Sequence, residues 1–156
     1  MHRRHFTTLA GLALLAPVVR AHHGWSSFDL AHPLYLQGRA VQVAWRNPHA
    51  EFELELAADL SLPADLAQRS LPPQTAPVDG ARLLQAARLP TRKDRRWQIE
   101  LAPLARMDAW KVTPIKPGDR VALLGFTLAD PKAPPLLRAE FLFVGTQVYG
   151  LRSSPA

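Results

Sequence analysis

The sequence predicts an all-β protein, a small OB-like barrel of five or six strands that follows an export signal. Apolar and polar residues alternate over short segments in both halves of the chain, which is typical of half-buried antiparallel strands. Pro, Gly, Asn and Asp residues separate these segments and indicate turns. A small all-β domain must protect its strand edges, and a closed five-stranded barrel does so economically.

The first 21 residues have the organisation of a secretory signal peptide. Arg3 and Arg4 form a charged start, residues 9–19 form a short apolar segment, and the chain is expected to be cleaved after Ala21. The apolar segment is shorter than the roughly 20 residues that span a membrane, so no membrane span is expected after cleavage. The paired arginines favour a twin-arginine signal, with an ordinary Sec signal as the alternative. Both routes predict a periplasmic protein.

The composition of the expected mature chain limits its number of domains, its partners and its chemistry. Removing 21 of the 156 residues leaves residues 22–156, enough for one domain. The net charge of +6 falls to +3 because the signal carries three arginines, and this surplus is too small to argue for nucleic acid as a partner. The chain has no cysteine, which excludes disulfides, thiolate metal sites and thiol catalysis.

The first two strands are expected at residues 34–45 and 50–57, where apolar residues recur at every second position. The "RNPH" segment between them is expected to form a turn, because Asn-Pro favours turn initiation. Residues 58–93 differ in composition, being rich in Pro and Ala. Their local helical spacing predicts an insertion with two short helices or helical turns joined by a Pro-rich loop.

Alternation returns in the C-terminal half. Residues 97–101 form a strand pattern, and residues 104–115 are expected to be a short connecting element with about one helical turn. A Pro-Gly-Asp turn precedes a strand that begins at Val121, with a bulge expected at Gly125. Residues 136–150 form the last strand region, and the tail "LRSSPA" is expected to fray.

The order of four segments resembles a known family. These segments are "HHGWSSFD", "LQGRAVQVAWRNPHAEFEL", "WQIEL" and "IKPGDRVALLGF". Together they resemble the DUF6152 family of small exported bacterial proteins of unknown function. The resemblance covers nearly the whole mature chain except residues 58–93, and it implies an exported β-barrel without supplying an activity.

Cleavage after Ala21 would make His22 and His23 the first two residues of the mature protein. All four histidines of the mature chain lie in its first 28 residues, and the other two are His32 and His49. An N-terminal amine with an unperturbed pKa of about 7.7–8 loses its proton readily to a metal ion. An amine and several imidazole nitrogens suit Cu(II), as in a histidine brace, although zinc would compete.

We therefore identify His22, His23 and His49 as candidate copper ligands, with His49 supplied by the Asn-Pro turn. Asp29 is expected either to accept a hydrogen bond from a histidine N–H and fix its tautomer, or to cap a turn. The alternative for the histidines is a structural or pH-sensitive cluster without metal. His32 is expected to be a loop residue.

These residues favour a periplasmic, non-catalytic binding protein whose partner is a metal ion. The alternative is a metal-free barrel that binds an exported or envelope protein. An enzyme is not indicated, since no nucleophile elbow, phosphate-binding loop or haem-attachment motif is present.

Overall fold

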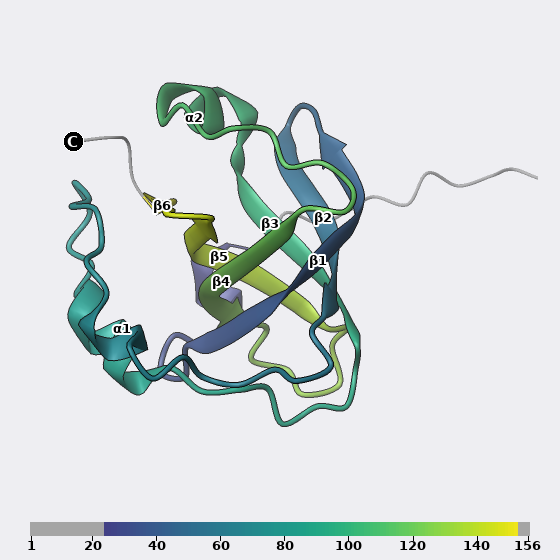
Figure 1. The fold of residues 1–156 in the computed structure, drawn as a ribbon, viewed down its shortest axis with the longest axis vertical. Helices are drawn as coiled ribbons and strands as arrows, with labels where there is room; N and C mark the ends of the chain where they lie inside the picture. The colour runs from purple at the N-terminus through teal and green to yellow at the C-terminus, as the bar shows by residue number, and fades with distance from the viewer. Residues whose placement is uncertain (1–23, 153–156) are drawn as a thin grey trace, which may run out of the picture.

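The computed structural model describes residues 24–152 and contains a six-stranded sheet, five strands of which close into a barrel (Figure 1). The predicted histidines His22 and His23 lie outside the described residues. The strands are β1 (Leu34–Trp45), β2 (His49–Leu56), β3 (Arg96–Pro103), β4 (Arg120–Thr127), β5 (Leu136–Val144) and β6 (Gln147–Gly150). The helices are α1 (Gly80–Ala86) and α2 (Leu104–Ala109), with 3₁₀ turns at Trp25–Ser27 and Leu66–Gln68.

The strand order confirms the predicted OB-like barrel. β1 pairs antiparallel with both β2 and β4, β2 pairs with β3, and β4 pairs with β5. The barrel closes where β3 runs parallel to β5, with residues 98–100 opposite residues 136–138. The order around the barrel is therefore 1-2-3-5-4, a Greek-key arrangement, with α2 connecting β3 to β4.

The predicted strands agree with the observed ones to within one residue in the first hairpin. The bulge expected at Gly125 is present, because the β4–β5 register shifts between Leu124 and Gly125. A Cβ atom at Gly125 would lie 2.3 Å from the Arg138 carbonyl oxygen, so the two backbones approach too closely for a side chain there. The predicted last strand region is divided by Gly145, whose φ of 56° makes the turn between β5 and β6.

The barrel interior is filled by alternate residues of its strands. Trp97 and Ile99 of β3, with Phe52 of β2 and Leu36 of β1, are almost completely buried there. Met107 of α2 joins the same cluster, so this helix closes one end of the barrel. This apolar core explains the stability of a domain that has no disulfide.

The insertion forms a second core on the outside of the barrel. Its buried residues Leu66, Leu84 and Ala87 pack against outward-facing side chains of β1, β4 and β5. These strand residues are Tyr35, Ala122, Leu124, Phe141 and Phe143. The predicted helical turns are present, but the insertion is a covering layer for three strands rather than a solvated loop.

The C-terminal end of the described chain does not fray as expected. Leu151 is buried, and its N–H donates a hydrogen bond to the Glu140 carbonyl oxygen at 2.9 Å. The expected fraying is therefore wrong for residues 151–152, whereas residues 153–156 lie outside the described part. Among the described helices, none is both long and apolar enough to cross a membrane.

Candidate functional site

His49 is the one predicted metal ligand that the structure describes. It begins β2, directly after the Asn47–Pro48 turn, whose peptide bond is cis. The Pro48 carbonyl oxygen accepts a hydrogen bond from the Leu104 N–H at 3.3 Å, which ties the turn to α2. The ring is half-buried with its Nδ1 atom inside, so a ligand would have to reach His49 through Nε2.

Among the described residues, Asp29 binds His32, which lies outside the predicted metal set. One carboxylate oxygen, Oδ2, lies 2.7 Å from His32 Nδ1, and the other accepts a hydrogen bond from the Ala31 N–H at 3.1 Å. The hydrogen bond with His32 lowers the pKa of Asp29. Asp29 therefore both caps a turn and orients a histidine ring, but that ring belongs to the residue interpreted as a simple loop histidine.

The described residues do not by themselves form a metal site. Within residues 24–152, no group of three or more His, Cys, Asp or Glu side chains is arranged to hold a metal ion. A site that uses His49 would therefore need donors from the segment before Gly24, which is where His22 and His23 lie.

The N-terminal arm is held on the barrel by a clamp around Trp25. The guanidinium carbon of Arg152 lies 3.5 Å from the Trp25 ring centroid, and that of Arg138 lies 4.7 Å from it. The Trp25 ring also contacts Phe28 and Phe126, with centroid distances of 6.0 and 6.3 Å. Cation–π contacts of this kind are worth about 0.5–2 kcal/mol each, so the clamp fixes where the arm meets β5.

The clamp and His49 are connected across the outer face of β5, β3 and β2. Arg138 Nη2 of β5 lies 3.1 Å from Glu100 Oε1 of β3, and both side chains are largely buried. Glu100 is the register partner of Glu51 in β2. His49 precedes Glu51 by two residues, and the alternating burial of β2 places both on the outer face.

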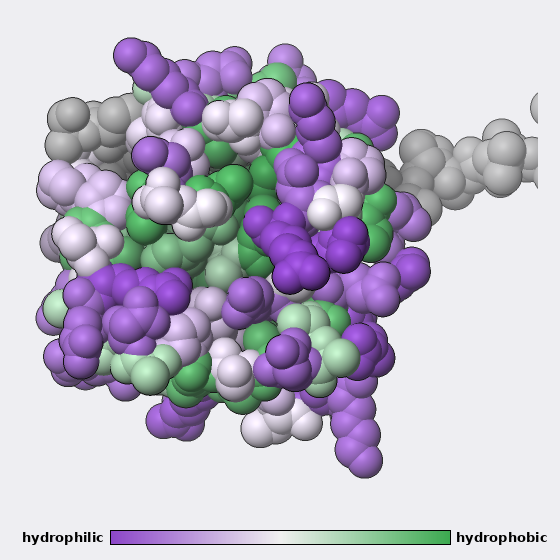
Figure 2. Space-filling model, viewed as in Figure 1, coloured by the Kyte–Doolittle hydropathy of each residue, from purple (hydrophilic) through white to green (hydrophobic). Residues whose placement is uncertain are grey.

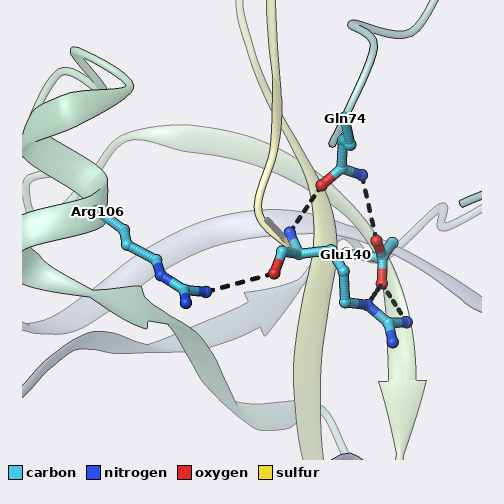
Figure 3. A network of polar contacts seen from close by, with 4 residues as sticks. Gln74, Arg106 and Glu140 are labelled. Carbon is cyan, nitrogen blue, oxygen red and sulfur yellow. Dashed lines mark hydrogen bonds and ion pairs between the residues drawn. The ribbon is translucent and has the colours of Figure 1, made fainter. Parts of the chain in front are cut away.

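A buried carboxylate anchors the clamp from the other side (Figure 3). Glu140 of β5 is 0% exposed, and its Oε2 accepts a hydrogen bond from Arg152 Nε at 2.7 Å. Gln74 bridges the pair, because its Nε2 donates to Glu140 Oε1 at 3.2 Å and its Oε1 accepts from the Arg152 N–H at 2.8 Å. Arg106 Nη1 donates to the Arg152 carbonyl oxygen at 3.3 Å.

The sequence offered one clue to this network. Glu140 is the one acidic residue among the apolar residues of β5, and a carboxylate in such a strand requires a partner. Gln74 lies 66 residues before it and Arg152 lies 12 residues after it, beyond β6, so periodicity could not identify either partner.

Comparison with known proteins confirms the predicted resemblance over the first part of its expected span. Residues 10–61 match the family of unknown function DUF6152, whereas the segments "WQIEL" and "IKPGDRVALLGF" lie outside the match. The matched segment contains the three candidate ligands His22, His23 and His49, together with Asp29. No curated protein and no solved structure matches the chain. The family match therefore supports the resemblance without assigning an activity.

Proposed function

We propose that this protein is a periplasmic, non-catalytic binding protein that holds Cu(II) at His22, His23 and His49 after its signal peptide is removed. The observation that carries the proposal is the Trp25 clamp. It holds the chain three residues after His22 on the barrel face that also carries His49. The arm therefore starts from a fixed point rather than from a free end.

The distances support convergence of these residues. A residue of extended chain spans at most about 3.6 Å, so His23 lies within about 7 Å of Trp25 along the backbone. Neighbouring strands are about 4.8 Å apart, and two strand spacings separate Arg138 from Glu51, while His49 lies two residues, or about 7 Å, further along β2. The arm and the imidazole side chains together have to cover this separation of about 12 Å for the rings to meet over β3.

The chemistry of the donors favours copper. Cleavage after Ala21 would provide an amine and an imidazole from one residue, and His23 and His49 would add two further nitrogens. Cu(II) prefers tetragonal nitrogen ligation and has the highest affinity among the divalent first-row ions. Glu51, two residues from His49 in β2, would add negative charge beside the site, which favours a cation, whereas the charge of Glu100 is offset by Arg138.

The decisive experiment measures copper binding by the processed protein. Native mass spectrometry of protein from the periplasm should give a chain that begins at His22 and binds one Cu(II) ion. Electron paramagnetic resonance should show nitrogen ligation. An extra Ala before His22, or His49→Ala, should weaken binding by at least about tenfold. His32→Ala is the matched control, because this exposed histidine is bound to Asp29 and should leave affinity unchanged.

Equal affinity in the Ala-extended protein would refute the proposal that the N-terminal amine is a ligand. A mature chain that begins elsewhere than His22 would refute it as well.

One surface observation favours the alternative of a protein-binding module. Figure 2 shows apolar surface gathered in the middle of one face, between α1 and α2, with polar side chains around it. Contiguous apolar patches rimmed by polar residues are typical of interaction sites. Co-purification of an exported protein with the chain, unchanged by a chelator and by His49→Ala, would favour this function if copper binding also failed.

A further inference from the structure

A groove of about 420 Å³ lies at the end of the barrel opposite His49, between β1, β4 and the chain that follows β2. Three arginines from three different segments line it, namely Arg39 of β1, Arg120 of β4 and Arg95, which precedes β3. Small-molecule sites have volumes of roughly 300–1,000 Å³, so the groove is large enough for a compact ligand. His49, the one predicted ligand that the structure describes, takes no part in it.

Two of these arginines lie side by side on neighbouring strands. Arg39 and Arg120 are direct partners in the β1–β4 ladder, and both are exposed. On its other side, Arg39 lies opposite Glu55 in the β1–β2 ladder. In the part of the chain that the structure describes, neither arginine forms an ion pair with a carboxylate, so both guanidinium groups can bind an anion in the groove.

The third arginine is held in place by the backbone. Arg95 Nη2 donates a hydrogen bond to the Leu56 carbonyl oxygen at 3.1 Å, which fixes its guanidinium at the wall of the groove. Its remaining N–H groups are donors that a ligand can use. Guanidinium groups bind carboxylates and phosphates with paired, directional hydrogen bonds.

The rest of the lining limits the charge of the ligand. Glu55, Asp59 and Gln37 also line the groove and offer hydrogen-bond acceptors. The arginines of the lining outnumber its two carboxylates, and one of these, Glu55, also pairs with Arg96 outside the groove, so the groove is net positive and favours an anion. The acceptors suit hydroxyl groups, and no aromatic side chain lines the groove to stack on a nucleobase.

We propose that this groove binds a sugar acid, with its carboxylate held by Arg39 and Arg120 and its hydroxyl groups held by Glu55, Asp59 and Gln37. The site is separate from the proposed copper site, and neither depends on the other.

Titration of the full mature chain with sodium glucuronate, followed by two-dimensional NMR, tests the proposal. We expect saturable shifts at Arg39, Arg95 and Arg120, and at least about tenfold weaker binding of the neutral sugar glucose. Arg39→Gln and Arg120→Gln should each weaken glucuronate binding by about tenfold or more. Arg82→Gln in α1 removes an exposed arginine outside the groove, and is the matched control.

Three results would overturn the proposal. The first is the absence of saturable glucuronate shifts in the folded protein. The second is inorganic phosphate binding as tightly as glucuronate, which would indicate a simple oxyanion site without hydroxyl recognition. The third is equal affinity in the Arg120→Gln and Arg82→Gln variants. Thermal melts establish that the variants fold, and Arg120→Gln should keep or raise Tm, because it removes one of two facing like charges and leaves Arg39 opposite Glu55.

Discussion

Glu140 is completely buried and is stabilised by Arg152 and Gln74. Removal of one partner of a buried ion pair leaves an uncompensated charge, which is more costly than the pair itself. Breaking a buried ion pair in this way typically costs about 3–5 kcal/mol. We expect Arg152→Ala to lower the free energy of unfolding by about 3 kcal/mol, the lower end of that range, because Arg152 keeps some contact with water.

Urea denaturation of Arg152→Ala and of the double variant Glu140→Gln, Arg152→Met tests this expectation. The double variant should be less destabilised, because it removes the charge together with its partner. A double variant as unstable as Arg152→Ala would mean that the packing of Arg152 on Trp25, and not its charge, dominates.

Tyr35 gives the protein a predictable response to alkaline pH. Burial raises the pKa of the Tyr35 hydroxyl above its ordinary value, and the hydroxyl donates a hydrogen bond to Gln37 Oε1 at 3.3 Å. Since the raised pKa belongs to the folded state, this contribution to stability is complete below about pH 10, the unfolded value. It is lost as the pH rises through the folded pKa.

Thermal melts between neutral pH and pH values above 10 measure this effect. Tyr35→Phe should flatten the alkaline decline in Tm, at a cost of about 1 kcal/mol near neutral pH for the lost hydrogen bond. An alkaline slope equal to that of the unsubstituted protein would contradict the assignment to Tyr35.

The sequence predicts the structural role of a single residue only where its neighbours along the chain determine that role. Gly125 was identified as a bulge because it interrupts an apolar strand pattern after a turn. The sequence did not predict the clamp of Trp25 by Arg138 and Arg152. Both arginines are more than 100 residues from Trp25, and they meet it only through the barrel topology. The roles of His22 and His23 remain predictions for the processed chain.

The insertion stabilises the protein as an element, because it covers an apolar face that β1, β4 and β5 would otherwise expose to water. Leu84 of α1 is buried in that interface, whereas Leu62 of the same insertion is 42% exposed. Leu84→Ala should therefore lower the free energy of unfolding by about 2–4 kcal/mol, while Leu62→Ala should change it by less than about 0.5 kcal/mol. Chemical denaturation of the two variants would contradict the covering role if both costs were similar.

The strands were predictable because alternation with a period of two follows directly from a half-buried sheet. The second core was not recognised, although the sequence contains a clue. β4 and β5 carry nearly continuous apolar runs, "VALLGF" and "FLFV", which indicate strands buried on both faces. Two remaining segments have several apolar residues, the insertion and residues 104–115, and the sequence alone does not say which of them covers the second face.

At the scale of the whole molecule, the two cores share the same strands, so they should unfold together. Leu36 and Leu123 face the barrel interior, while their neighbours Tyr35 and Leu124 face the insertion. Loss of the outer layer would therefore weaken the strands that close the barrel, and a domain of this size is expected to unfold in one step.

Two fluorescence signals test this expectation. Three of the four tryptophans lie in or against the first core, namely the fully buried Trp97 and the partly buried Trp45 and Trp110, so intrinsic tryptophan fluorescence reports mainly on that core. A fluorophore attached at Ala81→Cys, on the exposed surface of α1, reports on the second core. In denaturant the two midpoints should coincide, and Leu84→Ala should shift both by the same amount. An earlier transition at position 81 with an unchanged tryptophan midpoint would show that the insertion unfolds independently of the barrel.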